Sequence, residues 1–132
     1  MTPLNKQARL AGKWVTGAGL PGFYGVGYSY ATPKDNATAR YEFKIAKSGR
    51  YEVRMNYSPH ENRATKAPVT IESAEGTRTA TVNETIDPPI APGFVSVGTF
   101  RFESGKPAAV TLSSAGADGN VHADVVQLVP VP

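Results

Sequence analysis

Hydrophobic and polar residues alternate with a period of two along most of this chain. Residues 41–45 carry aromatic or aliphatic side chains at every second position, and residues 51–57 repeat the pattern after a Ser48-Gly49 turn. Strict alternation over four to eight residues is typical of a β-strand with one buried face. Because only a short turn separates the two segments, the pattern predicts that they pair as antiparallel neighbours.

Further short strands follow at regular intervals. Gly98 interrupts the longest of them, where a glycine is typical of a bulge. No stretch beyond the first dozen residues has a helical period. Seven to nine short strands separated by turns predict an all-β fold, an antiparallel β-sandwich of jelly-roll type. The additional strands are expected over residues 69–71, 78–84, 94–103, 108–112 and 121–129.

The length and composition agree with one compact domain. The 132 residues are 40% hydrophobic and 19% charged, and they include no cysteine. A disordered tail would be richer in charge and poorer in apolar residues. The missing cysteines exclude disulfide-stapled miniproteins, thiol enzymes and Cys-ligated zinc sites. We therefore expect a single β-sandwich domain over residues 12–132, preceded by a flexible N-terminal segment over residues 1–11.

The charges do not point to a nucleic-acid or membrane partner. The chain has 14 Lys and Arg residues against 11 Asp and Glu residues, which gives a net charge of +3. These residues are scattered, without the run of like charges that is typical of nucleic-acid binders. No apolar run is long enough to span a membrane. The first ten residues also lack the apolar stretch of a signal peptide.

The histidines are the candidate catalytic or metal-binding residues. His60 lies beside Glu61 in a loop, and His122 lies two residues before Asp124 on a strand. Two positions apart on a strand means the same face. His122 and Asp124 are therefore either structural neighbours, which we favour, or two ligands of a metal site whose other ligands the sequence does not identify. No GxSxG, HExxH or Walker pattern is present, so we do not expect an enzyme. A small hydrolase would need a cleft that pairs a histidine with two carboxylates.

Asp124 shares its strand face with Val126 and Leu128 and is therefore expected to be buried. A buried carboxylate needs a cation or several N–H donors. Arg63 is the natural partner, and the pair would lock a loop onto the sandwich; alternatively, Arg63 contacts a ligand directly. A structural calcium would first be sought at Asp124, but no set of six oxygen ligands is recognisable. We therefore predict no metal site and no cofactor.

Aromatic residues crowd into the N-terminal part of the chain. Trp14, Phe23, Tyr24, Tyr28 and Tyr30 fall within seventeen residues and are interleaved with glycines. Tyr and Trp rings stack on the apolar faces of sugars while their polar atoms form hydrogen bonds. This distribution favours carbohydrate recognition, although for any single ring we expect a place in the core more often than at a binding surface. The aromatic residues assigned to the core outright are Tyr41, Phe43, Tyr51, Phe100 and Phe102.

Three segments together resemble a known family. They are GKWVTGAGLPGFYGVGY (residues 12–28), YEVRMNYSPHENRATKAPVTI (residues 51–71) and FVSVGTFRFESGKPAAVTLSSAGADGNVHADVVQLVP (residues 94–130). In these segments the chain resembles the golvesin / xanthan lyase carbohydrate-binding-like domain, with its NRA and AD elements in order. The resemblance implies a β-sandwich module without catalytic residues. Such modules lie at the C-terminal end of secreted bacterial polysaccharide lyases, other hydrolases and FAD-dependent oxidoreductases.

The leading hypothesis is a non-catalytic carbohydrate-binding module that targets an appended enzyme to a polysaccharide. Its partners would be the polysaccharide and the host catalytic domain, and the family resemblance implies a secreted or extracellular location. The alternative hypothesis is a structural or protein-interaction β-sandwich that packs against its host enzyme and binds no glycan. The predicted carbohydrate-binding residues are Trp14, Tyr24, Tyr30, Asn62, Arg63 and Asn83.

Overall fold

A computed structural model describes residues 4–17, 28–57, 59–90 and 93–132. These residues form twelve β-strands and one short 3-10 helix, and no helix among them is long and apolar enough to cross a membrane. The elements are β1 (Leu4–Gln7), β2 (Arg9–Ala11), β3 (Val15–Gly17), β4 (Tyr28–Ala31), η1 (Pro33–Asp35), β5 (Thr38–Glu42), β6 (Gly49–Asn56), β7 (Ala67–Ser73), β8 (Gly76–Val82), β9 (Phe94–Phe102), β10 (Ala109–Ser113), β11 (Val121–Ala123) and β12 (Val125–Val131).

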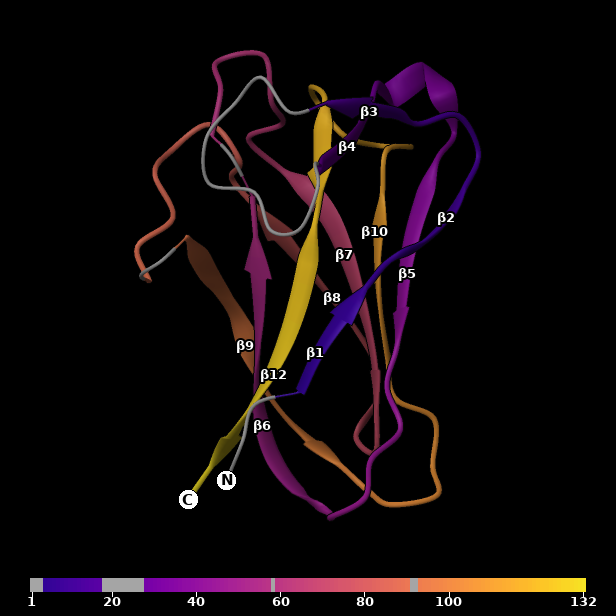
Figure 1. Cartoon of the computed structure of the whole chain (residues 1–132), viewed down its shortest axis with the longest axis vertical. Coiled ribbons are helices and arrows are strands. Elements are labelled where there is room, and N and C mark those ends of the chain that lie inside the picture. The colour runs from indigo at the N-terminus through magenta and orange to yellow at the C-terminus, as the bar shows by residue number, and fades with distance from the viewer. Residues whose placement is uncertain (1–3, 18–27, 58, 91–92) are drawn as a thin grey trace.

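Two antiparallel sheets face each other and enclose the core (Figure 1). The four-stranded sheet has the order β1-β12-β6-β9, and the five-stranded sheet has the order β2-β5-β10-β7-β8. A small third sheet, β11-β4-β3, lies at the upper end of the sandwich in Figure 1. The predicted antiparallel β-sandwich of jelly-roll type is confirmed.

The core consists of the inward-facing residues of both sheets, as the alternation predicts. Tyr41, Tyr51 and Phe102 are buried, and the rings of Tyr51 and Phe102 meet edge to face with centroids 5.9 Å apart. Phe43 and Phe100 pack against this cluster from its margin.

The predicted bulge in the longest strand is confirmed. Val53 lies opposite Gly98 and the next residue, Arg54, lies opposite Ser96, so Val97 is the extra residue of β9. Gly98 has a φ of +143°, a backbone conformation that side-chain-bearing residues rarely adopt.

The predicted pairing of residues 41–45 with residues 51–57 is wrong. β5 pairs with β2 and β10, whereas β6 pairs with β12 and β9. The two strands belong to opposite sheets, and both turn their apolar faces to the same core. Residues 43–48 therefore carry the chain from one sheet to the other, where the alternation alone had indicated a hairpin.

The N-terminal residues also differ from expectation. Residues 4–11, expected to be part of a flexible segment, form β1 on the edge of the four-stranded sheet and β2 on the edge of the five-stranded sheet. Twelve strands are present where seven to nine were expected, because five of them have only three or four residues. Such short strands are ordered by pairing with a neighbour and carry little pattern of their own.

Candidate functional site

Four ionisable side chains are buried at the end of the sandwich where β11 and the loops after β6 and β8 meet. Glu84 and His122 are fully buried, and Arg63 and Asp124 are each only 5% exposed. We call these four residues the polar cluster. Burying a charge without a partner is unfavourable. The contacts around these side chains therefore determine their protonation states and their role.

The loop that carries Arg63 is joined to the loop before β11 by backbone hydrogen bonds. Ala64 N–H donates to the carbonyl oxygen of Asn120 at 2.7 Å, and Asn120 N–H donates to that of Asn62 at 3.0 Å. The approach requires Gly119, because a Cβ there would lie 2.7 Å from the carbonyl oxygen of Arg63. These contacts fix the backbone of Arg63 and thereby position its side chain.

Asp118 fastens the same two loops from the side. Its carboxylate accepts hydrogen bonds from the backbone N–H groups of Thr65, at 2.9 Å, and Lys66, at 3.1 Å, and from the Thr65 hydroxyl. The Thr65 and Lys66 hydrogen bonds lower the pKa of Asp118, so the carboxylate remains ionised and keeps accepting these bonds.

Glu84 ties the loop after β8 to β11. Its Oε1 accepts a hydrogen bond from the backbone N–H of His122 at 2.7 Å. No described residue forms a hydrogen bond with Oε2, although that atom is buried. Burial raises the pKa of Glu84 to about 8, while the His122 N–H and the Arg63 charge oppose the rise. Glu84 is therefore a neutral carboxylic acid at pH 7.

His122 is neutral for the same physical reason. Burial, together with the nearby Arg63 charge, lowers the pKa of His122 to about 3. Because Glu84 and His122 are both fully buried, neither side chain can reach a substrate in solution. They hold the loops in place, and the surface above them carries the exposed groups.

Three of the predicted carbohydrate-binding residues lie together, and one of them, Arg63, belongs to the polar cluster. The Arg63 guanidinium lies over the ring of Tyr30, 5.3 Å from its centroid, a cation–π geometry. Arg63 Nη1 donates to Oδ1 of Asn62 at 3.1 Å. Tyr30 is half-buried and Asn62 is exposed. Arg63 is itself buried, so it orients the ring of Tyr30 and the amide of Asn62.

The other predicted carbohydrate-binding residues lie elsewhere or are already engaged. Trp14 is half-buried against the core, and its indole N–H donates to the carbonyl oxygens of Ala11, at 3.0 Å, and Thr38, at 3.1 Å. Asn83 Oδ1 accepts from the backbone N–H and the hydroxyl of Thr85. Tyr24 lies outside the described residues.

Asp124 is buried as predicted, and its carbonyl oxygen accepts a hydrogen bond from the Tyr41 hydroxyl at 3.0 Å. A direct ion pair between Arg63 and Asp124 stays a prediction. Among the residues that the structure describes, no group of three or more His, Cys, Asp or Glu side chains is placed to hold a metal ion.

Sequence reasoning missed Glu84 and Asp118. The alternation offered a signal for Glu84, because it continues the inward-facing series of Ala80 and Val82 past the end of β8. Asp118 offered none, because its partners are backbone groups more than fifty residues away in the sequence.

Comparisons with known proteins identify a family. The sequence profile described as the Golvesin C-terminal domain matches residues 2–130. The comparison with curated protein sequences gave no match.

Several solved structures share the fold. Paenibacillus xanthan lyase superimposes with a TM-score of 0.82 at 26% identity, over 98% of this chain and 12% of that protein. The Podospora anserina GH26-CBM35 β-(1,4)-mannanase gives a TM-score of 0.70 at 15% identity, over 98% of this chain and 28% of the enzyme. A family 35 carbohydrate-binding module from Clostridium thermocellum gives 0.65 at 13% identity, over 99% of this chain and 100% of the module. The chain thus spans a small part of the two enzymes but the whole of the module.

Proposed function

Because the chain belongs to the Golvesin C-terminal domain family, we propose that it is a non-catalytic carbohydrate-binding module that targets an appended enzyme to a polysaccharide. The family resemblance drawn from residues 12–28, 51–71 and 94–130 is thereby confirmed. The host enzyme and its substrate belong to the proposal, as does a secreted or extracellular location.

The observation that carries the proposal is the extent of the similarity. The Clostridium thermocellum module is covered from end to end by this one domain, so the shared fold is by itself a complete carbohydrate-binding module in that protein. In the mannanase and in xanthan lyase the same fold makes up 28% and 12% of a larger protein. An accessory role beside a catalytic domain follows most directly from this pattern.

The surface around Tyr30 supplies suitable chemistry. A sugar ring stacks on an aromatic face through its C–H groups, while its hydroxyl groups form hydrogen bonds with amide and carbonyl groups. The buried Arg63 guanidinium contacts both the half-buried ring of Tyr30 and the exposed amide of Asn62. Two such contacts support weak binding per site, roughly micromolar to millimolar, because ordering costs offset much of the gain.

Retention on immobilised polysaccharides tests the proposal. Affinity electrophoresis of the wild-type domain through a panel of neutral and acidic polysaccharides should show retardation on at least one of them. Tyr30→Ala and Asn62→Ala should each weaken that retardation about five- to thirty-fold, the effect of losing about 1–2 kcal/mol of contact energy. The matched control is Ser104→Ala in the exposed turn after β9, which should behave as the wild type.

Two results would count against the proposal. If no polysaccharide on a broad panel retards the wild-type domain, it is not a carbohydrate-binding module, and the alternative of packing against a host enzyme takes its place. If Ser104→Ala weakens binding as much as Asn62→Ala while circular dichroism shows both folded, the surface around Tyr30 is not the site.

A further inference from the structure

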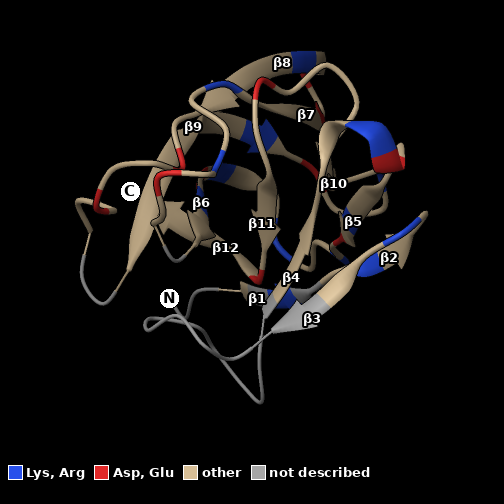
Figure 2. Cartoon of the chain, turned by 90° about the horizontal axis from the view of Figure 1, so that it is seen from above, with Lys and Arg blue, Asp and Glu red and all other residues tan. Residues whose placement is uncertain are grey.

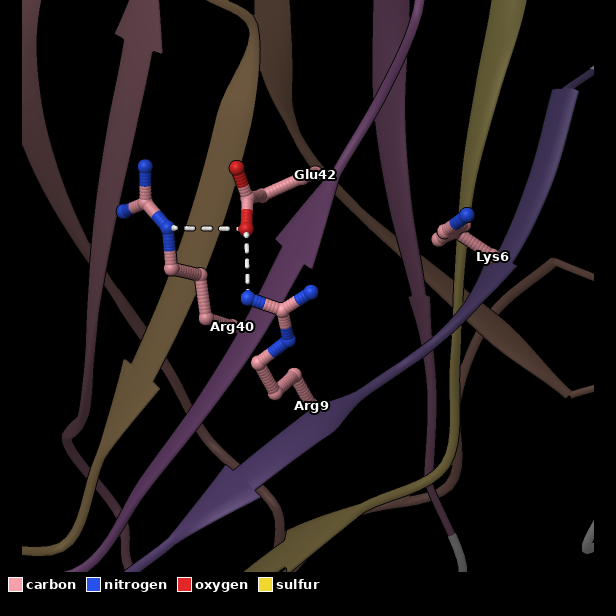
Figure 3. Close-up of a pocket in the computed structure, with 4 residues that line it drawn as sticks. All are labelled: Lys6, Arg9, Arg40 and Glu42. Carbon is pink, nitrogen blue, oxygen red and sulfur yellow. Dashed lines mark ion pairs between the residues drawn. The ribbon is translucent and has the colours of Figure 1, made fainter.

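A pocket lies on the side of the sandwich. It has a volume of about 210 Å³ and is lined by Lys6, Arg9, Arg40 and Glu42. Figure 3 shows Arg9 and Arg40 paired with the Glu42 carboxylate, with the Lys6 side chain farther to one side. We call this the basic pocket, and none of its residues belongs to the polar cluster or to the surface around Tyr30.

The basic pocket is created by the crossing of the N-terminal chain. Lys6 belongs to β1, opposite Val126 in the four-stranded sheet, whereas Arg9 belongs to β2, opposite Arg40 in the five-stranded sheet. In Figure 1 the indigo chain passes diagonally from β1 to β2. This crossing brings a cation from each sheet to the same edge.

The ion pairs within the basic pocket leave much of its positive charge unsatisfied. Arg9 Nη1 and Arg40 Nε approach the same Glu42 oxygen at 3.5 Å and 3.7 Å, distances too long for good hydrogen bonds. Arg40 is further compensated by Glu72, whose Oε2 accepts from Nη1 at 2.6 Å. The Arg9 side chain is 82% exposed, so most of its five N–H donors face solvent.

Lys6 adds an exposed ammonium that forms no ion pair with a described residue. The four lining residues therefore carry three positive charges against one negative charge. Exposed ion pairs such as that of Arg9 with Glu42 contribute little, so an incoming anion could replace that contact at small cost. Arginine binds carboxylate and sulfate groups in a bidentate geometry that a lysine alone does not offer.

We propose that the basic pocket binds the anionic substituent, a carboxylate or a sulfate ester, of an acidic polysaccharide. The proposal rests on the proposed function and specifies its substrate class. The volume lies below the roughly 300 Å³ at which pockets for small molecules begin. The basic pocket therefore suits the anionic group of a single sugar unit, while the rest of the polymer lies outside it.

The outer face of the five-stranded sheet leaves a polar path for the rest of the polymer. Cross-strand partners share a face, and one register row runs from Arg9 through Arg40, Thr111 and Thr70 to Thr79. Four strand spacings of about 4.8 Å make this row about 19 Å long. It ends in a shallow groove of about 390 Å³ that Thr70, Thr79 and Thr81 line in part. A sugar chain anchored by its acidic group can therefore continue across hydroxyl groups.

Two double variants separate a specific site from general electrostatics. Lys6→Gln with Arg9→Gln removes two positive charges from the basic pocket. Lys34→Gln with Lys47→Gln removes two from exposed positions on η1 and on the loop before β6. Both proteins have the same net charge, and the basic residues are otherwise spread over many strands and loops (Figure 2), so a purely long-range effect would be equal in the two.

The measurement is an NMR titration of the amide signals with three probes: methyl glucuronoside, glucose 6-sulfate and methyl glucoside. The two anionic probes should shift the signals of Lys6, Arg9 and Arg40 saturably, and the neutral probe should not. Lys6→Gln with Arg9→Gln should weaken anion binding about ten-fold or more, as expected for loss of charge-assisted hydrogen bonds. Lys34→Gln with Lys47→Gln should bind as the wild type, and the ratio of the two anion affinities identifies the preferred group.

The outcomes distinguish this proposal from the proposed function. Equal weakening in the two double variants, or the same shifts with methyl glucoside, would overturn the basic pocket as an anion site. Shifts at Tyr30 and Asn62 without shifts at Arg9 would leave the proposed function intact and remove the acidic substrate class. Saturable shifts at Arg9 that are lost only in Lys6→Gln with Arg9→Gln would establish the basic pocket even if Tyr30 responds to no sugar.

Discussion

Replacing Glu84 with glutamine should lower the stability of the protein at acidic pH and raise it at alkaline pH. Glutamine is nearly isosteric with a protonated glutamic acid, and its Oε1 can still accept the 2.7 Å hydrogen bond from His122 N–H. Unlike the acid, it never ionises. The Glu84→Gln variant therefore represents the protonated form of the polar cluster at every pH.

The magnitude follows from the two pKa values of Glu84. Its pKa is 4.5 without the fold and rises to about 8 in the folded protein. Between these values the folded protein holds a proton that the unfolded chain has released, so the free energy of unfolding falls by about 1.4 kcal/mol per pH unit. Over the whole window the loss reaches about 5 kcal/mol, which is a large fraction of the stability of a domain of this size.

The two stability curves should consequently cross. Glutamine brings a second N–H donor to the position of Oε2, which has no described partner, at a cost of about 1 kcal/mol. Glu84→Gln should therefore be about 1 kcal/mol less stable than the wild type near pH 4.5 and about 4 kcal/mol more stable at pH 9.

Urea unfolding at pH 4.5, 7 and 9 measures the difference, with the fluorescence of the single tryptophan, Trp14, and circular dichroism as probes. Groups common to both proteins, including His122, cancel in the comparison. Glu61→Gln, which removes the same charge from an exposed position, is the control and should run parallel to the wild type. Parallel curves for Glu84→Gln would refute the reasoning, because they would mean that Glu84 is ionised in the folded protein at pH 7.

Four further predictions concern the same end of the molecule. The ring signals of His122 should stay those of a neutral imidazole from pH 7 down to about pH 4, since its pKa lies near 3; protonation near pH 6 would contradict its burial. Below the unfolded pKa of 6.5 the unfolded chain binds a proton that folded His122 does not, so His122 should make stability fall as the pH drops toward 3. Gly119→Ala should lower the free energy of unfolding in urea by about 2 kcal/mol, because its Cβ would lie 2.7 Å from the Arg63 carbonyl oxygen. The control Gly49→Ala, whose Cβ would meet no heavy atom within 4 Å, should lower it by less than half as much. The melting temperature should be the same with calcium and with a chelator. A higher melting temperature in calcium would reveal an ion site, and Asp124 would be the first candidate ligand to substitute.

The sequence was sufficient to predict where most strands lie but not which strands pair with one another. The period-two pattern predicted a strand at each of the seven longer strands, and the glycine predicted the bulge at Gly98, because both signals are local. The pattern also joined residues 121–129 into one strand, whereas the structure divides them between β11 and β12, which belong to different sheets. The assignment of β5 and β6 to opposite sheets depends on which edges β10 and β12 occupy. Those strands follow some seventy residues later, and no local pattern encodes the choice.

The candidate site was predictable where the residue types themselves suggested contacts. Tyr30, Asn62 and Arg63 were selected for their chemistry, and they do lie together. The dependence of Arg63 on Asn120 and Gly119 was not predictable, because it rests on backbone hydrogen bonds and on a close approach of two loops. The number of aromatic residues near the N-terminus also did not reveal that the Trp14 N–H is already bound to two carbonyl oxygens.

Burying four ionisable side chains is energetically unfavourable for a domain of this size, and this bears on the role of the polar cluster. Well-packed apolar side chains in place of buried ionisable groups often leave stability unchanged or raise it, so stabilisation of the sandwich does not by itself explain the cluster. Its specific consequence is geometric: the Glu84 hydrogen bond holds His122, and the Asn120 contacts hold the backbone beside Arg63. Arg63 then lies over Tyr30 and holds the Asn62 amide. The binding surface that we propose, one ring and one amide, depends on such fixed placement, because each freely rotating side chain that must be ordered costs about 0.5–1.5 kcal/mol of the small affinity available.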